Sequence, residues 1–443
     1  MQNMNPPNSI KRSVLPKGAI NYLTTPVRQF LAIESVSGIF LIICTVIALI
    51  LANSPLEGSV HEFWNTTVQL NIAEWTFKLT LHHIVNDGLR TLFFFVIGLE
   101  IKRELVIGEL STLQKAALPV IAALGGMLAP AGIYLALQWN QPGERGWGVP
   151  MATDIAFVVG VLALFGKRVP VGLKVFLLSL AIADDVGAIL VIAIAYSGSP
   201  DWFAFGFAAA GLLLCFLFNR LGVRTIFIYF AIGVGIWFAM FNSGIHPTIA
   251  GVLLGLLTPA SAWVGQARLK DALSTTLGRV SGSKANSHDF QHLESAVREA
   301  TSPLDRLQSA LHSWVGYVIM PLFALANAGV HIQIGDMRSP VGIAIVCGLV
   351  LGKPIGIFGL SFLAVKLRIA KLPTGVNWKL LAAAGCLGGI GFTMSLFIAE
   401  LAFIDAKMLD AGKFGIIIGS VLSAVIGCVF LALGLKTGKQ VRE

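Results

Sequence analysis

Charged residues are scarce in this chain of 443 residues, where Asp, Glu, Lys and Arg make up 12% and hydrophobic residues 56%. Soluble domains carry about 25% charged residues. Together with a mean hydropathy of +0.79, this scarcity excludes a soluble globular domain. The net charge of +9 does not indicate nucleic-acid binding, because the basic residues flank apolar runs, as in membrane proteins. We predict an all-α polytopic membrane protein whose partner is the lipid bilayer.

Cysteine is also rare, and no cysteine pair has the spacing of a metal site. All five cysteines lie inside apolar runs, at Cys44, Cys215, Cys347, Cys386 and Cys428. We interpret them as inert, small hydrophobic residues, and we expect no cofactor and no enzymatic activity. The polar segment Met1–Ala32 lacks a signal-peptide cleavage pattern. We therefore expect the first apolar run to remain as a helix.

Long apolar runs dominate the rest of the chain, and a spanning helix needs about 20 such residues. Twelve segments qualify as candidate spans, with the seventh and eighth read as a tight helical hairpin. They are Val36–Ala52, Gly88–Ile101, Ala116–Leu137, Val149–Phe165, Val171–Tyr196, Phe203–Phe218, Ile226–Phe241, Ile245–Leu257, Trp314–Val330, Val341–Val365, Leu380–Ala402 and Phe414–Leu435. The sequence thus predicts a cytoplasmic segment at 1–35, a transmembrane domain at 36–435 and a cytoplasmic tail at 436–443.

Basic residues set the orientation of these spans. Of the 32 Lys and Arg, 25 fall on the side that carries both termini and 5 on the other. Two more, Arg90 and Lys353, lie within spans. Because basic residues concentrate in cytoplasmic loops, both termini are predicted to be cytoplasmic. The asymmetry also supports the number of spans, since a missed span would scramble it.

Two polar segments interrupt the apolar pattern. The segment 64–82 alternates between apolar and polar residues, which predicts a periplasmic β-hairpin, although an irregular loop fits about as well. An isolated hairpin is marginally stable, so we expect it to pair with a partner such as a second copy of the chain. The segment 263–302 has mixed charge and many Ser, Gly and Ala residues. We expect it to be a flexible cytoplasmic loop and assign it no chemistry.

Two adjacent aspartates, Asp184 and Asp185, lie in the middle of the apolar run 171–194. A charge at the bilayer centre costs about 2.5–3.5 kcal/mol on insertion scales, and such residues mark ion or proton sites. Carboxylate oxygens suit a hard cation such as sodium, and burial beside a like charge favours protonation of one partner. Purely structural pairing is disfavoured, because one available cation cannot neutralise two aspartates. A site that holds either a cation or protons is what antiport requires.

Two further spans have the pattern of broken helices. In GVPMATDIAFVVG, Pro150 removes a backbone donor just before Thr153 and Asp154. The second candidate, 385–395 (GCLGGIGFTMS), contains four glycines. A glycine-rich span alone would indicate close helix packing. Two such spans in corresponding halves of the chain instead favour a transporter core.

The sequence LVLGKPIGIF places Lys353 deep within the tenth span. It imitates a phosphate-binding loop, but the glycine spacing is one short and Pro354 replaces the Ser or Thr. We therefore reject nucleotide binding. A buried lysine without a partner would lose its proton, so we pair it with an aspartate of the fifth span. Three core aspartates against one lysine leave surplus negative charge for cations or protons.

Other titratable residues lie near helix ends. His246 stands beside Pro247 and could sense pH, although a hydrogen-bonded helix-end histidine fits at least as well. Three residues of GLEIKREL, namely Glu100, Arg103 and Glu104, form either a pH-responsive cluster or an interfacial ion-pair network. Asp87 and Arg90 are one helical turn apart, so we expect them to pair with each other.

These features together resemble the bacterial NhaA-type sodium/proton antiporter family. The matching stretches occur in family order across nearly the whole chain: ESVSGIFLIICTVIALILANSP, DGLRTLFFFVIGLEIKREL, TDIAFVVGVLALFGKRVP, LSLAIADDVGAILVIAI, SGIHPTIAGVLLG, PLFALANAGV, LGKPIGI and GGIGFTMSLFIA. The resemblance implies inverted-topology repeats, with two broken helices that cross near the membrane midplane. It also implies an electrogenic exchanger of the bacterial inner membrane, usually a dimer through the outer hairpin, that expels Na+ or Li+ against H+.

The resemblance also assigns roles to residues. Asp185 would be the principal cation and proton carrier, and Asp184 would be held by Lys353 until the cation arrives. Asp154 and Lys353 would compensate the facing ends of the broken helices, beside Thr153. Residues of the pH response would be His246, Glu100, Arg103 and Glu104.

The chain departs from the family pattern before the ninth span and near the outer mouth. In SPLDRLQSALHSW, Gln308 and Ser309 stand where more ionisable residues are expected, which leaves His312 for the pH response. Arg90 is an unexpected charge.

Two rival functions also depend on aspartates within the membrane. An intramembrane aspartyl protease lacks support here, because neither aspartate region has its Gly-x-Gly-Asp context. A sodium-coupled symporter of an organic anion is kept as the alternative.

Overall fold

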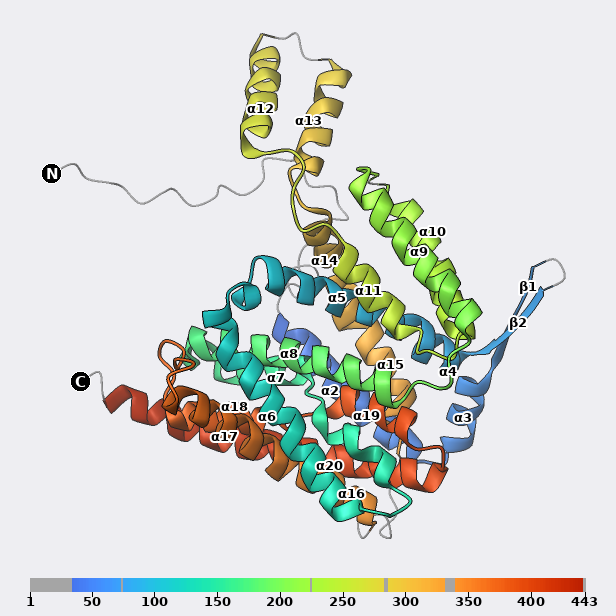
Figure 1. Ribbon diagram of the computed structural model, residues 1–443, viewed down its shortest axis with the longest axis vertical. Coiled ribbons are helices and arrows are strands. Elements are labelled where there is room, and N and C mark those ends of the chain that lie inside the picture. Colours follow the sequence, from blue (N-terminus) through green and yellow to red (C-terminus); the bar gives the residue numbers. More distant parts are fainter. Residues whose placement is uncertain (1–33, 73–74, 224, 283–285, 331–338, 441–443) are drawn as a thin grey trace.

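The computed structural model describes residues 34–72, 75–223, 225–282, 286–330 and 339–440. Within these ranges the chain is helical apart from two strands and the connecting turns (Figure 1). The predicted N-terminal segment 1–35 lies almost wholly outside the described residues. Helix α20 continues through Gln440, so residues 436–440 of the predicted tail extend the last helix.

The first half of the chain contains ten α-helices in its described residues. They are α2 (Glu34–Ala52), α3 (Glu57–Asn65), α4 (Leu81–His83), α5 (Arg90–Val106), α6 (Leu113–Gln138), α7 (Ile155–Phe165), α8 (Val171–Ala195), α9 (Trp202–Arg220), α10 (Ile226–Asn242) and α11 (Thr248–Leu257). Short 3-10 segments connect some of them: η2 (Glu109–Ser111), η3 (Glu144–Met151) and η4 (Gly166–Arg168).

In the described residues of the second half, the regular elements are all helical. They are α12 (Gln266–Ser281), α13 (Ser287–Glu299), α14 (Pro303–Trp314), α15 (Met320–Asn327), α16 (Pro340–Cys347), α17 (Lys353–Lys366), α18 (Trp378–Gly388), α19 (Phe392–Ala402) and α20 (Ala406–Gln440). Three π-helical turns join consecutive helices into longer spans: η1 (Ile84–Leu89), η5 (Val315–Ile319) and η7 (Gly348–Gly352). Such turns often occur at functional sites, and here Arg90 and Lys353 each follow one directly.

The described helices fit a multi-pass membrane protein. By length and composition, 7 of them could each cross a membrane, or 9 spans if each of two bent helix pairs is counted as one. Every predicted span coincides with helix, but α5 and α10 have 17 residues each and α11 has 10. Twelve spans therefore remain a prediction. The helix that contains the ninth predicted span begins earlier than expected, at Pro303, so His312 lies on that helix.

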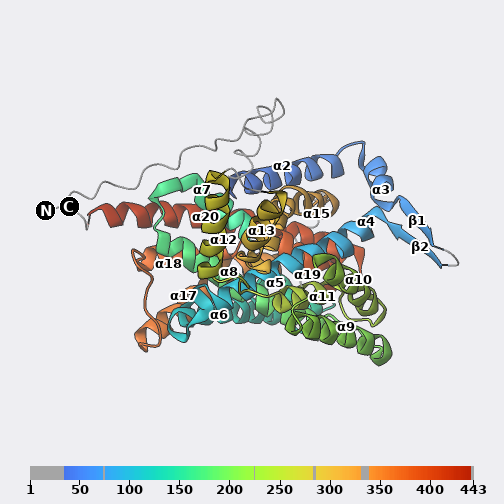
Figure 2. The ribbon, with the colours of Figure 1, turned by 90° about the horizontal axis from the view of Figure 1, so that it is seen from above.

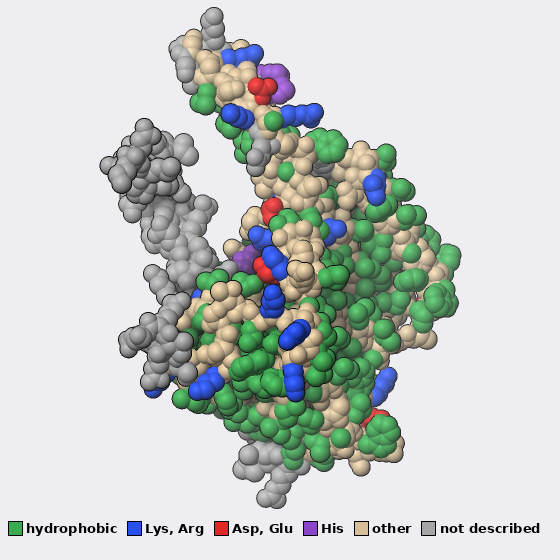
Figure 3. Space-filling view, turned by 60° about the vertical axis from the view of Figure 1, so that its left-hand side comes forward, with side chains coloured by type: hydrophobic (Ala, Val, Ile, Leu, Met, Phe, Trp, Pro, Cys, Tyr) green, Lys and Arg blue, Asp and Glu red, His purple; other side chains and the backbone are tan. Residues whose placement is uncertain are grey.

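The exposed surface of the bundle is largely apolar, as contact with lipid requires. Figure 3 shows hydrophobic side chains across a broad face on which few charged groups appear. On α9, Phe203 is 77% exposed and Phe207 61%. On α10, Phe227 is 74% exposed. Large aromatic side chains left open in this way mark a surface that is covered in the cell, and a bilayer covers helices of this length.

Glycines let the main helices approach closely. At Gly125 of α6, an added Cβ would collide with the backbone of Gly356 on α17. At Gly98 of α5, it would meet the Val252 carbonyl oxygen of α11 at 2.5 Å. These two contacts lie in different parts of the bundle. Figures 1 and 2 show α9, α10 and α11 at one side and α17 and α18 at the opposite side.

The segment predicted as a hairpin contains two antiparallel strands with helix at both ends. Strand β1 (Thr67–Ile72) pairs with β2 (Trp75–Thr80), from Thr67 opposite Thr80 to Ile72 opposite Trp75. Residues 64–65 belong to α3 and residues 81–82 to α4, so the strands are shorter than the predicted segment. Figure 1 shows the pair standing out from the side of the bundle.

The expectation of a flexible loop at 263–302 was wrong for the described residues. Helices α12 and α13 fill most of it and stand out from the bundle (Figure 1). A capping box starts α13: Asn286 accepts from the third residue of the helix, and Asp289 accepts from the Asn286 backbone N–H at 3.0 Å. Arg279 of α12 forms an ion pair with Asp289. Mixed charge here reflects solvated helix faces rather than disorder.

Candidate ion site at two interrupted helices

The first interruption separates η3 from α7. Pro150 lies inside the 3-10 segment, and the backbone then becomes extended, with φ −78° and ψ 150° at Ala152. Asp154 is the N-cap of α7, where its Oδ1 accepts from the Phe157 N–H at 3.3 Å. An N-cap carboxylate satisfies a free N–H and complements the positive end of the helix. The predicted break therefore occurs where Pro150, Thr153 and Asp154 indicated.

The second interruption separates α18 from α19, which are bent by 43° across residues 389–391. The backbone of this interruption contacts that of the first. The Asp154 N–H donates to the Ile390 carbonyl at 2.7 Å, and Ser395 Oγ donates to the Val149 carbonyl at 2.8 Å. At Gly391 an added Cβ would meet the Ala152 carbonyl oxygen at 3.0 Å. The absence of a side chain at Gly391 thus lets the two backbone segments approach closely.

Asp154 lies at the start of two helices at once. Besides capping α7, its Oδ2 accepts from the backbone N–H of Thr393 at 3.0 Å and from the Thr393 hydroxyl. Thr393 is in the first turn of α19. One carboxylate, 1% exposed, therefore serves the positive ends of both interrupted helices.

Lys353 and Asp184 form a buried ion pair beside the two interruptions. Lys353 Nζ donates to Asp184 Oδ2 at 2.5 Å and to Thr153 Oγ1 at 2.9 Å. The Thr153 hydroxyl also lies 2.6 Å from Asp184 Oδ2 and 2.8 Å from the carbonyl oxygen of Gly388, the last residue of α18. The pairing of the lysine with an aspartate of the fifth span is therefore present, and Thr153 connects it to the interruptions.

Asp185 is different from its neighbour. It is 3% exposed, and its Oδ1 makes no hydrogen bond to the part of the chain that the structure describes. Asp184 Oδ1 is likewise without a hydrogen-bond partner there. Adjacent residues point about 100° apart on a helix, and the Lys353 ammonium contacts Asp184. The two carboxylates retain free acceptor capacity, which a small hard cation or protons could use.

The residues predicted for a pH response do not gather in one place. Glu100 of α5 is close enough to act electrostatically on Asp185. Farther along α5, Arg103 Nη1 donates to Gln308 Oε1 at 3.3 Å, and Glu104 Oε2 accepts from the Glu109 N–H at 2.9 Å. The remaining two lie elsewhere, with His246 between α10 and α11 and His312 on α14.

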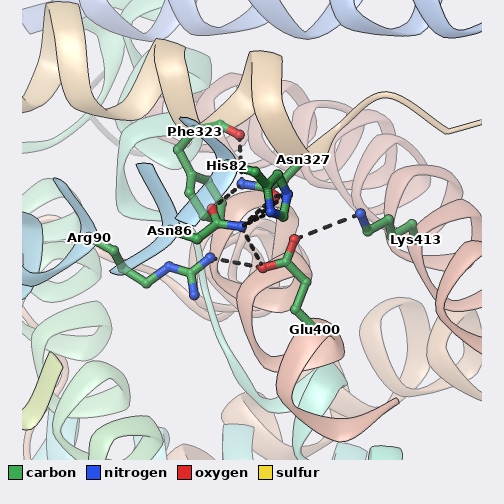
Figure 4. A network of polar contacts seen from close by, with 7 residues as sticks. All are labelled: His82, Asn86, Arg90, Phe323, Asn327, Glu400 and Lys413. Carbon is green, nitrogen blue, oxygen red and sulfur yellow. Dashed lines mark hydrogen bonds and ion pairs between the residues drawn. The ribbon is translucent and has the colours of Figure 1, made fainter. Parts of the chain in front are cut away.

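Sequence reasoning missed a second buried network and mispaired Arg90. Arg90 Nη2 donates to Glu400 Oε2 at 2.9 Å, so its ion pair is with α19 and not with Asp87 (Figure 4). Lys413 Nζ lies 3.7 Å from Glu400 Oε1. The signal was an intramembrane glutamate in SLFIAEL, which is costly unless partnered.

The two interrupted helices indicate the class of protein. Interrupted helices that meet beside buried carboxylates, inside a bundle of apolar helices, are typical of a secondary ion transporter. The chain belongs to the family described as Na+/H+ antiporter 1, which matches residues 28–431. As a member, it is a multi-pass membrane protein that exchanges sodium for protons.

Individual relatives support this assignment. The chain is 50% identical over 422 residues to Na(+)/H(+) antiporter NhaA 2 of Acidiphilium cryptum, covering 94% of each chain. It is 48% identical to Na(+)/H(+) antiporter NhaA of Rhizobium meliloti, covering 97% of this chain and 99% of the relative. The solved sodium proton antiporter MjNhaP1 of Methanocaldococcus jannaschii is 12% identical with a TM-score of 0.51, over 93% of this chain and 99% of that one. That likeness shows a shared fold.

Proposed function

We propose that cytoplasmic Na+ or Li+ and external H+ compete for Asp184 and Asp185. The observation that carries this proposal is the unequal pairing of two buried carboxylates, because Lys353 binds Asp184 and no described residue hydrogen-bonds Asp185 Oδ1. A buried carboxylate without a partner is stable only when it is protonated or binds a cation. Each binding event thus excludes the other, which is the condition for exchange.

Lys353 acts as an internal stand-in for the transported cation. When Na+ binds both aspartates, its charge replaces that of the ammonium at Asp184, and Lys353 turns to Thr153, which is already 2.9 Å away. When the cation leaves, the ion pair re-forms. We take Lys353 to release its proton when the cation displaces it from Asp184 and to regain one when the ion pair re-forms, while Asp185 takes a second proton. Two protons then move against one monovalent cation, so the exchange is electrogenic.

The surroundings of the site supply regulation. Glu100 acts electrostatically on Asp185, so a change in its protonation alters the competition directly. We assign the remaining pH response to Arg103, Glu104, His246 and His312, which lie near ends of helices. A lower proton concentration then favours cation binding.

We further propose the cellular arrangement that the charge asymmetry predicts. The protein lies in the bacterial inner membrane with both termini in the cytoplasm and twelve spans as two inverted repeats, whose broken helices cross near the midplane. Strands β1 and β2, which project from the bundle (Figure 1), form a periplasmic hairpin in this arrangement. A two-stranded sheet leaves unpaired edges, so a second copy of the chain pairs there to form a homodimer.

Everted membrane vesicles from cells that lack other sodium exchangers test the ion site. The vesicles are energised to an acidic interior and followed with a pH-sensitive dye, and Na+ is added at several pH values. Dequenching is expected with the native chain and with Asp271→Asn, a control at an exposed position of α12. It is expected to disappear with Asp185→Asn. Normal dequenching with Asp185→Asn would refute the site, and dequenching only with an added organic anion would indicate a symporter.

A further inference from the structure

A second set of polar side chains forms a network of hydrogen bonds and ion pairs within the bundle (Figure 4). Three of its members, His82, Asn86 and Arg90, are spaced four residues apart along α4, η1 and α5. They therefore lie along one side of that helical stretch. The others come from three different helices: Asn327 from α15, Glu400 from α19 and Lys413 from α20. The set thus connects α4–α5 to the second interrupted helix.

Hydrogen bonds fix two asparagines, Asn86 and Asn327, beside the ion pair of Arg90 with Glu400. Asn86 Nδ2 donates to Asn327 Oδ1 at 3.0 Å, and Asn327 Nδ2 donates back to Asn86 Oδ1 at 2.7 Å. Asn86 Nδ2 also reaches Glu400 Oε2 at 3.4 Å. His82 Nε2 lies 3.2 Å from Asn327 Oδ1. Asn327 of α15 therefore fixes the Asn86 side chain that contacts Glu400.

The guanidinium of Arg90 lies between two aromatic rings and beside a cavity. Its centre is 4.0 Å from the ring centroid of Phe397 and 4.7 Å from that of Phe323. Arg90, Phe397 and Thr393 line the same cavity, and Thr393 is the residue that donates to Asp154. The cavity, of about 20 Å³, therefore lies between Arg90 and Thr393, the residue of α19 that contacts the ion site.

We propose that the Arg90–Glu400 pair is the outward-side gate of the exchanger. This inference rests on the proposed function and its orientation. Arg90 is at the end of α5 opposite Lys102 and Arg103, about 20 Å away at 1.5 Å per residue, and the basic end is the cytoplasmic one. While the pair is closed, it separates the cavity from the outer side.

The ion pair of Arg90 with Glu400 is weak enough to open. Arg90 is 6% and Glu400 14% exposed, and Arg90 Nε has no hydrogen-bond partner in the described residues. Desolvation offsets much of the attraction in a buried ion pair, so water that enters an opening path competes well for both groups. Glu400 lies seven residues after Thr393, about 10 Å along α19. Movement of α19 at the ion site is thus transmitted to the gate.

Thiol labelling tests the gate independently of transport. All five native cysteines are replaced, Met394 of the cavity lining becomes the single cysteine, and a membrane-impermeant thiol reagent is added to right-side-out or everted vesicles. Arg90→Gln is expected to speed labelling from the outer side about tenfold or more, by shifting the population toward the open state. The control is Lys115→Gln, which breaks the exposed Lys115–Glu109 pair and leaves the rate unchanged.

A double-mutant cycle separates gating from general loosening. Arg90→Gln, Glu400→Gln and the double variant are expected to speed outer labelling to the same extent, because each removes the same contact. If Arg90→Gln does not fold, Arg90→Lys replaces it, because lysine keeps the charge but loses the planar fork. Arg90→Lys is expected to increase the outer labelling rate less than Glu400→Gln does. Unchanged outer labelling, equal acceleration from both sides, or fold-changes that multiply in the double variant would overturn the gate. Normal exchange by Asp185→Asn would refute the proposed function. The labelling rates are measured without transport, so the two proposals can fail separately.

Discussion

Replacing Lys353 by methionine removes one partner of a buried ion pair and leaves the other behind. The side chains of Lys353 and Asp184 are 0% and 1% exposed, and their charged atoms are 2.5 Å apart. Removing one member of such a pair costs about 3–5 kcal/mol, because the remaining charge is buried without compensation. Lys353→Met is therefore expected to lower the free energy of unfolding by that amount.

The double variant with Asp184→Asn distinguishes this cause from lost packing. With both charges gone, the site is expected to regain most of the stability, because an apolar or neutral replacement of a whole ion pair is often nearly neutral. Exchange is expected to be lost in both variants. Stability is measured by thermal unfolding in detergent, followed through the fluorescence of the 9 tryptophans. A double variant no more stable than Lys353→Met would refute the reasoning.

Three further predictions follow from other contacts. Asp154→Ala removes the caps of α7 and α19 and is expected to cost about 2 kcal/mol, at about 1 kcal/mol per cap, as measured by thermal unfolding. Gly125→Val drives α6 from the α17 backbone and should destabilise by about 1–3 kcal/mol or more, whereas Gly132→Val, which meets nothing within 4 Å, should not. The backbone N–H of Asn286 and the α12 guanidinium hold the pKa of Asp289 below its ordinary 3.8. This support of α13 is complete above pH 3.8 and is lost as pH falls through the lowered pKa, so amide exchange in α13 should rise in acid, and less so with Asp289→Asn.

Much of the ion site could be predicted from the sequence because its signals are local. Asp184 and Asp185 stand out in an apolar run, and Pro150 breaks the helix that precedes Asp154. The pairing of Lys353 followed from its burial, since a buried lysine needs a carboxylate to keep its proton. Local signals could not predict which residues of the two interruptions contact each other, such as Ser395, whose hydroxyl donates to a carbonyl oxygen 246 residues away.

The errors arose where local rules competed with distant contacts. Asp87 is one turn from Arg90, so helical spacing favoured that pair, but Glu400, 310 residues away, takes the hydrogen bond. Spacing along a helix says nothing about a carboxylate that another helix brings closer. The helices at 266–299 were missed for a different reason: they lack an apolar run, and their stability depends on capping and ion pairs such as Arg279–Asp289.

The π-helical turn η7 makes the position of Lys353 depend on chain length as well as on side-chain chemistry. A π-turn accommodates one residue more than an α-helical turn, and each residue rotates a helix by about 100°. Deleting one residue from 348–352 would therefore make the span regular and turn either Lys353 away from Asp184 or α16 away from its neighbours. The same holds for η1 and Arg90. Both buried cations thus depend on the register that a single extra residue sets, so a deletion that changes no functional side chain would still disable them.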